Sequence, residues 1–337
     1  MEIKELLLRE IGKFKNNKII FSNYHVSTDN MNKHNQPIFY SKKGNLYEKT
    51  NILMSNIRPY FNKVWYSDRT GSKSSNVLCF VVTNNNVLSK YAYYLICSDK
   101  FNNFWSKTSK GTTMPVGDKE AILNFKFKIC DKVTQQKIIN IIEPFEKLQN
   151  SLKRKINTLE IMMLKIANQS YVLGKMKNFD IDFEKGINIK SIYLTNQKTD
   201  KTFINVSAIN NKPNKYLLNC EVIENINYGD VVLSLDGTIG LVNNFLKGVN
   251  GYGYKVTSNN IHNSIIYCSL IDERNKKIIQ ENSNGSVIKH SSNSKKELLL
   301  LDIQNKNVIS FFNLQVIYKK TLNIIDYIID KLINLCL

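Results

Sequence analysis

The chain has 337 residues, of which 42% are hydrophobic, so it is long enough for two domains that each bury a core. Its 47 Lys and Arg residues exceed its 28 Asp and Glu residues, which gives a formal net charge of +19. That charge favours a polyanionic partner, either nucleic acid or an anionic membrane face, although a lysine-rich proteome would also produce it. The composition excludes a disordered chain, and no segment reaches the roughly 18 apolar residues of a transmembrane helix.

Cysteine and histidine usage argues against a metal site or a disulfide framework. The six cysteines are scattered without a CxxC pair, and the four histidines show no metal-ligand spacing. The N-terminal segment is charged throughout, unlike a signal peptide. We therefore expect free thiols, no bound metal and a cytoplasmic protein that does not bind membranes.

Residues 18–100 predict a β-rich region, because short β-branched or aromatic runs alternate there with Asn, Gly and Ser. The segment 89–105 predicts one helix with an aromatic face that covers the sheet. A glycine loop, SKGTTMPVGD at 109–118, and a short strand-like run follow it. The aromatic residues expected in the core are Tyr60, Phe61, Trp65, Tyr93, Tyr94, Phe104 and Trp105.

Residues 132–172 contain one proline and no glycine, and their apolar residues recur at coiled-coil spacing. The pattern predicts a helix of about 60 Å, at about 1.5 Å per residue, which Pro144 would kink or delay. Its stripe comprises Ile138, Ile142, Phe145, Leu148, Leu152, Ile156, Leu159, Met163 and Ile166.

The order of patterns then repeats. Strand-like runs, including 202–210, precede a helical segment at 261–280 and a second loop, SNGSVIKHSS at 283–292. A second long helix starts at about residue 304, with the stripe Leu314, Ile317, Thr321, Ile324, Ile328, Leu332 and Leu335. Gly111 and Gly285 hold the same place in the two loops, 174 positions apart (285 − 111), which indicates two copies of one unit.

The predicted fold is α+β: two β-rich domains held apart by two long antiparallel coiled-coil helices, with an internal pseudo-two-fold repeat. The predicted boundaries are 1–131 for the first β-rich domain, 132–172 for a central spacer helix, 173–303 for the second β-rich domain and 304–337 for a C-terminal spacer helix.

No catalytic motif accompanies this architecture. The chain has no adjacent prolines, which a DNA amino-methyltransferase motif would contain, and no GxGxxG, GxxxxGK[ST] or GxSxG. DGTIG at 236–240 is interpreted as a β-hairpin turn. We therefore expect no catalytic residue and no cofactor in this chain.

Three pairs of stretches resemble the specificity (S) subunit of bacterial type I restriction-modification systems. They are YHVSTDNM (24–31) with NILMSNIRPYFNKVW (51–65), SKGTTMPVGDKEAILNFKFKI (109–129) with QQKIINIIEPFEKL (135–148), and GDVVLSLDGTIGLV (229–242) with NGSVIKH (284–290). The resemblance covers nearly the whole chain in the family's order. The short N-terminus, the run KICDKVTQQK and the short final helix depart from the usual pattern and bear on how partner subunits dock.

The resemblance implies a DNA-binding subunit of a phage-defence system, without enzymatic activity of its own, in which two target-recognition domains read a bipartite, asymmetric double-stranded DNA sequence. It implies two modification subunits that methylate adenine with S-adenosylmethionine, and restriction subunits that use ATP and Mg. Two alternatives stay open: the specificity subunit of a split-site modification system outside type I, and a non-catalytic, basic nucleic-acid-binding scaffold with a coiled coil. The internal repeat disfavours the scaffold.

DNA reading needs Lys and Arg for phosphates, and amide, hydroxyl or guanidinium groups for base edges. The candidates in the first domain are Ser55, Asn56, Arg58 and Lys63, then Lys73, Ser74 and Ser75 in an expected polar loop, and Lys110, Thr112 and Thr113 beside Gly111. The candidates in the second domain are Asn210, Asn211, Lys212, Ser234, Asp236, Thr238, Lys255, Lys289 and His290. Each is as well explained as a solvated side chain or a turn former. Met114 and Ile288 are expected to anchor the two loops in the core.

Overall fold

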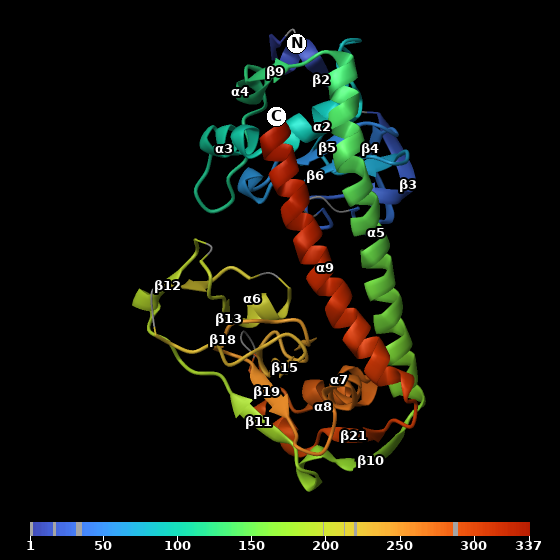
Figure 1. Ribbon diagram of the computed structural model, residues 1–337, viewed down its shortest axis with the longest axis vertical. Helices are drawn as coiled ribbons and strands as arrows, with labels where there is room; N and C mark the ends of the chain where they lie inside the picture. Colours follow the sequence, from blue (N-terminus) through green and yellow to red (C-terminus); the bar gives the residue numbers. More distant parts are fainter. Residues whose placement is uncertain are drawn as a thin grey trace. The chain divides into compact units, whose positions relative to one another are not determined.

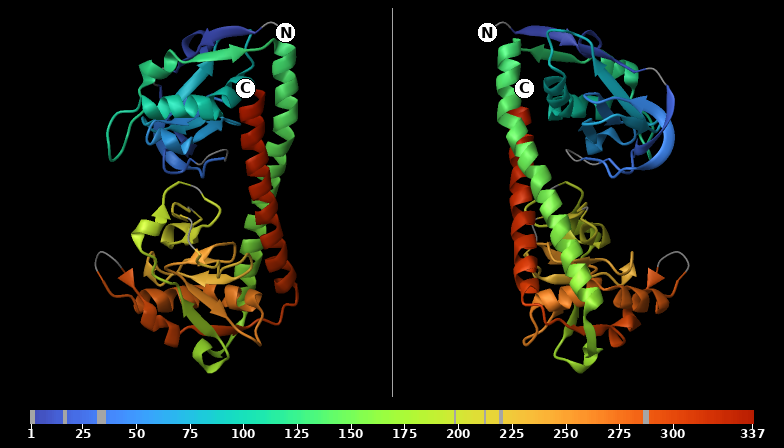
Figure 2. Two further views of the ribbon diagram at one scale, coloured as in Figure 1. Left: turned by 60° about the vertical axis from the view of Figure 1, so that its left-hand side comes forward. Right: turned by 90° about the vertical axis from the view of Figure 1, so that its right-hand side faces the viewer.

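The structure, a computed structural model, describes residues 3–15, 18–31, 36–197, 199–211, 213–218, 221–285 and 289–337 (Figure 1). It is an α+β protein whose chain divides into two compact units. Unit 1 comprises Met1–Ser151 and Ile324–Leu337, and unit 2 comprises Leu152–Asn323. Two long helices, α5 (Lys132–Gln169) and α9 (Asn307–Cys336), each contribute one part to each unit (Figure 2).

Unit 1 is built on a four-stranded antiparallel sheet of order β2-β8-β5-β6, next to a closed ring formed by β3, β4 and β7. Its strands are β1 (Lys4–Leu7), β2 (Gly12–Phe14), β3 (Ile19–Val26), β4 (Tyr40–Tyr47), β5 (Ile52–Ser55), β6 (Val64–Tyr66), β7 (Gly71–Lys73), β8 (Val77–Val82) and β9 (Lys126–Ile129). Its short helices are α1 (Leu8–Ile11), η1 (Pro59–Phe61), α2 (Ser89–Cys97), α3 (Asp99–Lys107) and α4 (Lys119–Leu123). β5 is buried at every position, which explains its continuous apolar run.

Unit 2 has a four-stranded antiparallel sheet of order β11-β19-β15-β17 and several two-stranded pairs. Its strands are β10 (Tyr171–Lys175), β11 (Asp182–Lys185), β12 (Leu194–Thr195), β13 (Phe203–Ile204), β14 (Tyr216–Leu217), β15 (Val231–Leu233), β16 (Asp236–Gly237), β17 (Val242–Asn243), β18 (Val249–Asn250), β19 (Tyr254–Thr257), β20 (Lys289–His290) and β21 (Leu299–Asp302). Its short helices are η2 (Met176–Asn178), η3 (Ser191–Tyr193), α6 (Val206–Ile209), α7 (Asn263–Ile271), α8 (Glu273–Glu281) and η4 (Ser292–Lys296).

Three local predictions are wrong because polar residues cap helices inside the predicted segments. Segment 89–105 forms two helices, since Ser98 is extended (φ −62°, ψ 146°) and its hydroxyl accepts from the Phe101 N–H. Segment 261–280 breaks in the same way at Asp272 (φ −64°, ψ 143°). The strand predicted at 202–210 is only β13, because Asn205 then caps α6 by accepting from the Ala208 N–H.

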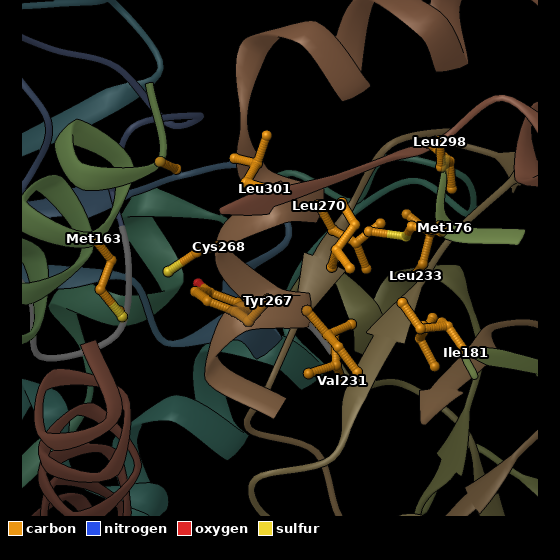
Figure 3. Packing of buried hydrophobic residues seen from close by; sticks show 14 of the residues in the cluster. Met163, Met176, Ile181, Val231, Leu233, Tyr267, Cys268, Leu270, Leu298 and Leu301 are labelled. Atoms are coloured by element: carbon orange, nitrogen blue, oxygen red, sulfur yellow. The ribbon is translucent and has the colours of Figure 1, made fainter. Parts of the chain in front are cut away.

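The main core of unit 2 joins its sheet to α7 and to both long helices. Figure 3 shows Tyr267, Cys268 and Leu270 of α7 near Val231 and Leu233 of β15. Met163 of α5 and three residues of α9, Val308, Phe312 and Val316, belong to the same buried cluster. The long helices are therefore part of the hydrophobic core of this unit.

The apolar stripe predicted for α9 is displaced by one position. Leu314, Ile317, Ile324 and Leu335 are exposed, at 37%, 53%, 59% and 80%. The buried positions are Val308, Phe312, Gln315, Val316, Ile325, Ile329 and Ile333. One residue turns a helix by about 100°. Counting apolar residues missed the buried face because Gln315, a polar residue, lies within it.

The stripe predicted for α5 agrees better with burial. Ile142, Leu152 and Met163 are buried, but Leu148 is 47% exposed and Gln149 is buried instead. The helix ends at Gln169, short of the predicted 172, and continues through Pro144.

Buried polar contacts hold the long helices in each unit. In unit 1, the Gln149 amide of α5 donates to Asp326 Oδ1 of α9 at 2.5 Å. In unit 2, the Lys319 ammonium of α9 donates to Asn244 Oδ1 at 3.0 Å, and Asn244 Nδ2 donates to Gln315 Oε1 at 2.8 Å. Burial lowers the pKa of Lys319 to about 8, although Glu160 attracts its charge.

The cysteines are in keeping with the expected neutral thiols. The five that the structure describes are free, and Cys220 lies outside the described residues. Burial raises the pKa of Cys79 to about 11 and that of Cys268 to about 12. Within the described part of the chain, no helix is long and apolar enough to span a membrane.

We predict that the protein becomes more stable as the pH rises from about 7.5 to about 9.5. Folded Lys319 loses its proton near pH 8, whereas its ordinary pKa is 10.5, so the unfolded chain binds more protons in this interval and the free energy of unfolding increases. Because Lys319 is only half-buried as a residue, we expect a gain of roughly 1–2 kcal/mol rather than the full value of the shift.

Urea unfolding at both pH values measures this gain. Lys319→Met should remove it, whereas Lys165→Met, at an exposed lysine of α5, should retain it. The same pH dependence in all three proteins would contradict the assignment to Lys319.

Candidate nucleic-acid interface

Two loops of unit 1 meet beyond the end of β5. The first runs from residue 56 to 63, and the second, residues 108–118, follows α3. Ile57 and Val116 form an antiparallel bridge, and the Arg58 N–H donates to Pro115 O at 2.8 Å. Backbone hydrogen bonds therefore fix one loop against the other.

The second loop closes on itself around Gly111. Lys110 and Val116 exchange backbone hydrogen bonds of 2.9 and 2.8 Å, and Gly111 has φ 96°, which favours glycine. Thr112 and Thr113 are exposed at its tip. Met114 is 57% exposed, so the expectation that it anchors the loop in the core is wrong. The backbone bonds make such an anchor unnecessary.

Gly117 lets this loop pass directly against the core. Its N–H donates to Asn56 O at 2.9 Å. A Cβ atom at Gly117 would lie 1.9 Å from Trp105 Nε1 and 2.7 Å from Asn56 Oδ1. No side chain fits there without displacing the loop or Trp105.

Three of the candidate residues in unit 1 are buried. The Ser55 hydroxyl donates to Ile57 O at 3.0 Å, and Asn56 is 7% exposed. Lys73 is 5% exposed, and burial lowers its pKa. It was expected in a polar loop but belongs to β7, whose backbone pairs with β3 and β4. These three side chains are therefore less accessible than the other candidates of unit 1, and that they contact DNA stays a prediction.

The remaining candidates of unit 1 are accessible to different degrees. Arg58 is exposed, and no hydrogen bond or ion pair ties its guanidinium to another described residue. Lys63 is half-buried and donates to Thr28 O at 2.8 Å. Lys110 is exposed and pairs with Asp118 at 2.8 Å, which raises the pKa of Lys110 and lowers that of Asp118. Ser74 is half-buried and Ser75 is exposed.

Unit 2 contains a loop pair built from the same contacts. The buried Ser234 hydroxyl donates to Asp236 O at 3.1 Å, and β16 pairs with β20 through Asp236 and His290. Asn284 and His290 exchange two backbone hydrogen bonds of 2.9 Å around Gly285, which has φ 103°. Residues 234–241 connect the paired strands β15 and β17, so the hairpin interpretation is confirmed.

The other candidates of unit 2 are spread over several loops. Asn210 and Asn211 follow α6 and are exposed, as are Thr238, Lys289 and His290. His290 Nδ1 lies 2.8 Å from Asp236 Oδ1. Lys255 is half-buried, pairs with Asp230 at 3.0 Å and donates to Asn225 O, so its charge is neutralised within the unit. Lys212 lies outside the described residues. That these side chains contact DNA stays a prediction.

Two comparisons with known proteins, one of the sequence and one of the fold, point to the same kind of protein. Residues 2–160 match the family model of the type I restriction modification DNA specificity domain. The fold of the chain is similar to the crystal structure of a type I restriction-modification system S subunit from M. genitalium, with a TM-score of 0.55 and 12% identity over 99% of this chain and 96% of that one.

Residues 2–160, slightly less than half of the chain, therefore resemble a type I restriction modification DNA specificity domain, and the similarity of fold extends over nearly the whole chain. Two further structures align at 12% identity over 99% of this chain: one from a study of complex assembly and conformational transition of the type I R-M system (TM-score 0.42, 98% of that chain), and the HsdS subunit from Thermoanaerobacter tengcongensis (TM-score 0.36, 95% of that chain). No curated protein sequence matches this chain.

The exposed loop residues of the specificity domain offer hydrogen-bond donors and positive charge. Arg58, Lys110, Thr112 and Thr113 present a guanidinium, an ammonium and hydroxyls of the kind that contact phosphates and base edges. Among the described residues, no group of His, Cys, Asp and Glu could hold a metal ion.

Two surface features of the specificity domain were missed. Tyr60 and Phe61 were expected in the core, yet they are 50% and 49% exposed. The β3–β4 hairpin carries Phe21, 64% exposed, opposite Lys43. The signal for the first was present in the sequence, because RPYFN places two aromatic residues in a turn between polar ones.

We predict that Gly117→Ala destabilises unit 1 by roughly 1–3 kcal/mol, because the added methyl group overpacks the contact with Trp105. The shift in the midpoint of urea unfolding measures the loss. Thr112→Ala, an exposed change in the same loop, should stay within about 0.5 kcal/mol of the wild type. Equal midpoints for all three proteins would show that the loop does not pack against Trp105 in this way.

Proposed function

We propose that this chain reads a bipartite, asymmetric DNA sequence and carries methyltransferase subunits to it. Each unit binds one half of the sequence, and the chain itself is not catalytic. Two modification subunits supply adenine methylation with S-adenosylmethionine, and restriction subunits, where present, supply cleavage with ATP and Mg. The complex acts in the cytoplasm, where its DNA is found.

The observation that carries this proposal is the recurrence of one loop pair in both units. Ser55 and Ser234 each donate to the carbonyl two residues later, and each strand-end loop is bridged to a loop that contains a left-handed glycine. The capping helices α2 and α7 begin at residues 89 and 263, and α3 and α8 at 99 and 273, both 174 residues apart. These offsets support the predicted internal repeat.

Charge supports DNA as the partner of both loop pairs. The formal net charge of +19 favours a polyanion, and exposed cations stand on the loops at Arg58, Lys110 and Lys289. Two similar basic sites in one chain suit a split DNA sequence better than a single continuous ligand.

The exposed face of α9 supports docking of partner subunits. Leu314, Ile317, Ile324, Tyr327 and Leu335 recur at spacings of three, seven, three and eight residues and are 37–80% exposed. This spacing places them on one side of the helix. An apolar stripe of this kind is the surface that a helix of another subunit would cover.

Sequencing of methylated adenines tests the proposal. Cells that carry this chain with the methyltransferase encoded beside it should show one bipartite methylated sequence. The purified chain alone should transfer no methyl group from S-adenosylmethionine. Methyl transfer by the chain alone, or no site-specific methylation in the presence of the partner, would overturn the proposal.

Arg58→Ala should relax specificity at one position in one half-site. A guanidinium that binds a guanine edge through two hydrogen bonds contributes roughly 1–3 kcal/mol of discrimination. Methylation mapping measures the relaxation, and Arg154→Ala, at an exposed arginine of α5, is the matched control. Uniform weakening on all sequences, with a salt slope smaller by about 0.9, would make Arg58 a phosphate contact instead.

The two long helices should set the gap between half-sites. We predict that four residues inserted after Lys153 in α5, with four after Tyr318 in α9, lengthen the gap by one or two base pairs. The positions are matched because Lys155 Nζ lies 5.6 Å from the Tyr318 ring centre. The insertion adds about 6 Å and a net rotation of about 40°, whereas one base pair of DNA adds about 3.4 Å and a tenth of a turn.

Methylation mapping reads this gap directly. Insertion in α5 alone breaks the pairing between the helices and should abolish methylation. An unchanged gap in an active double-insertion variant would show that the helices are not the spacer.

A further inference from the structure

Tyr60 and Phe61 are adjacent aromatic residues that the fold leaves half exposed, at 50% and 49%. Their ring centroids lie 4.6 Å apart with an interplanar angle of 52°, so the rings contact each other. Full burial of an aromatic side chain contributes about 1.5–3 kcal/mol. Nearby Tyr94 and Trp105 are almost fully buried, at 0% and 1%. The exposed pair therefore contrasts with these buried rings, although Phe21 of β3 is also exposed, at 64%.

The backbone on both sides of the pair is left-handed. Arg58 precedes η1 with φ 50°, which costs an arginine about 1–3 kcal/mol, and Asn62 follows it with φ 47°, which asparagine tolerates. Asn62 is buried, and its Nδ2 donates to Cys97 O at 2.8 Å. Pro59 is buried at the first position of the turn. The core thus anchors the ends of the turn, while Tyr60 and Phe61 point outward.

The surroundings of the pair are positively charged. Arg58 is exposed and has no ionic partner among the described residues, and Lys63 Nζ lies 5.7 Å from the Phe61 ring centre. Lys107 is exposed at the end of α3, which packs against η1. Residues 55–66 contain no Asp or Glu. Exposed rings within a rim of cations complement a duplex, whose phosphates flank a stack of bases.

We propose that Tyr60 and Phe61 form an aromatic wedge that enters the base stack of the half-site bound by unit 1 and opens one base step. The proposal rests on the DNA-reading function and adds a mechanical step to it. Apolar side chains inserted between bases unstack them and kink the duplex. Lys107 then contacts a phosphate beside the opened step, and Arg58 contacts a base edge next to it.

The proposed wedge acts in only one of the two DNA half-sites, because only unit 1 carries the aromatic pair. The loop that follows Ser234 in unit 2 has Gly237 and Gly240 and no aromatic residue up to Leu241. DNA distortion by this mechanism should therefore occur in the half-site of unit 1 and not in that of unit 2.

The test uses duplexes of the bipartite sequence defined by methylation mapping, with 2-aminopurine placed at one position at a time. The methylated adenines are left unmodified, so that base flipping by a methyltransferase does not contribute. Full-length chain, alone and with its modification subunits, should raise the fluorescence several-fold at one step of one half-site. The double variant Tyr60→Ala/Phe61→Ala should lose this rise, bind the site about 10–100-fold more weakly and retain the salt slope of binding.

Two control variants and a stability measurement separate loss of the wedge from misfolding and from the loss of any other exposed aromatic residue. Tyr60→Phe/Phe61→Tyr keeps both rings and should keep the fluorescence rise. Phe21→Ala removes an aromatic residue of β3 that is 64% exposed and should leave the rise unchanged. Urea unfolding of the double alanine variant should match the wild type, because both rings are at the surface.

The outcomes distinguish the two proposals. If the wild type methylates a bipartite site but no step outside the target adenines brightens, or if the alanine variant brightens equally, the wedge is wrong and the DNA-reading function stands. If the alanine variant loses its modification subunits while the chain alone still opens the step, the rings form a subunit interface and the wedge is wrong. If the wild type recognises no specific DNA, the proposed function itself fails.

Discussion

The antiparallel bridge between Ile57 and Val116 is the contact on which the candidate interface of unit 1 depends. Backbone groups form it, and the buried Ser55 hydroxyl closes the turn before it. Asp236 and His290 form the corresponding bridge in unit 2. Since main-chain atoms hold these loops together, their exposed side chains can differ without loosening the framework. This division suits a DNA-reading protein, in which the framework has to be rigid and the exposed side chains have to match the DNA.

Buried polar groups fix the register of the long helices more strictly than apolar packing could. Gln149 bonds to Asp326 in unit 1, and Asn244 bonds to Gln315 and Lys319 in unit 2. A buried polar group that loses its partner costs about 1–3 kcal/mol, so a one-residue slip of either helix would be strongly opposed. Apolar side chains alone would tolerate such a slip more easily. In this register the apolar residues Leu314, Ile317, Ile324, Tyr327 and Leu335 of α9 are exposed.

Structural features that follow from apolar spacing and turn residues could be predicted from the sequence. Features that follow from the burial of polar side chains could not. The β-rich regions and both long helices were predicted because strand and helix periods are visible in β5, α5 and α9. The stripe of α9 was displaced because Gln315 is a core residue only by virtue of Asn244, 71 positions away. In the candidate site, Arg58 and the Gly111 loop were found, but the burial of Lys73 depends on pairing with distant strands. The exposure of Tyr60 and Phe61 likewise follows from tertiary anchoring at Asn62.

The backbone conformation at Arg58 links the framework to function. Gly237 lies at the corresponding step of unit 2, three residues after the serine, and it too has positive φ, at 74°. Glycine adopts that conformation without steric cost, whereas an arginine there destabilises the fold by about 1–2 kcal/mol. A glycine at position 58 would keep the turn and relieve the strain, so the framework alone does not explain the arginine. The guanidinium is exposed and makes no ion pair with another described residue, so it is accessible to a partner. Strain at an exposed cation beside two exposed rings supports the proposed DNA contact of this loop.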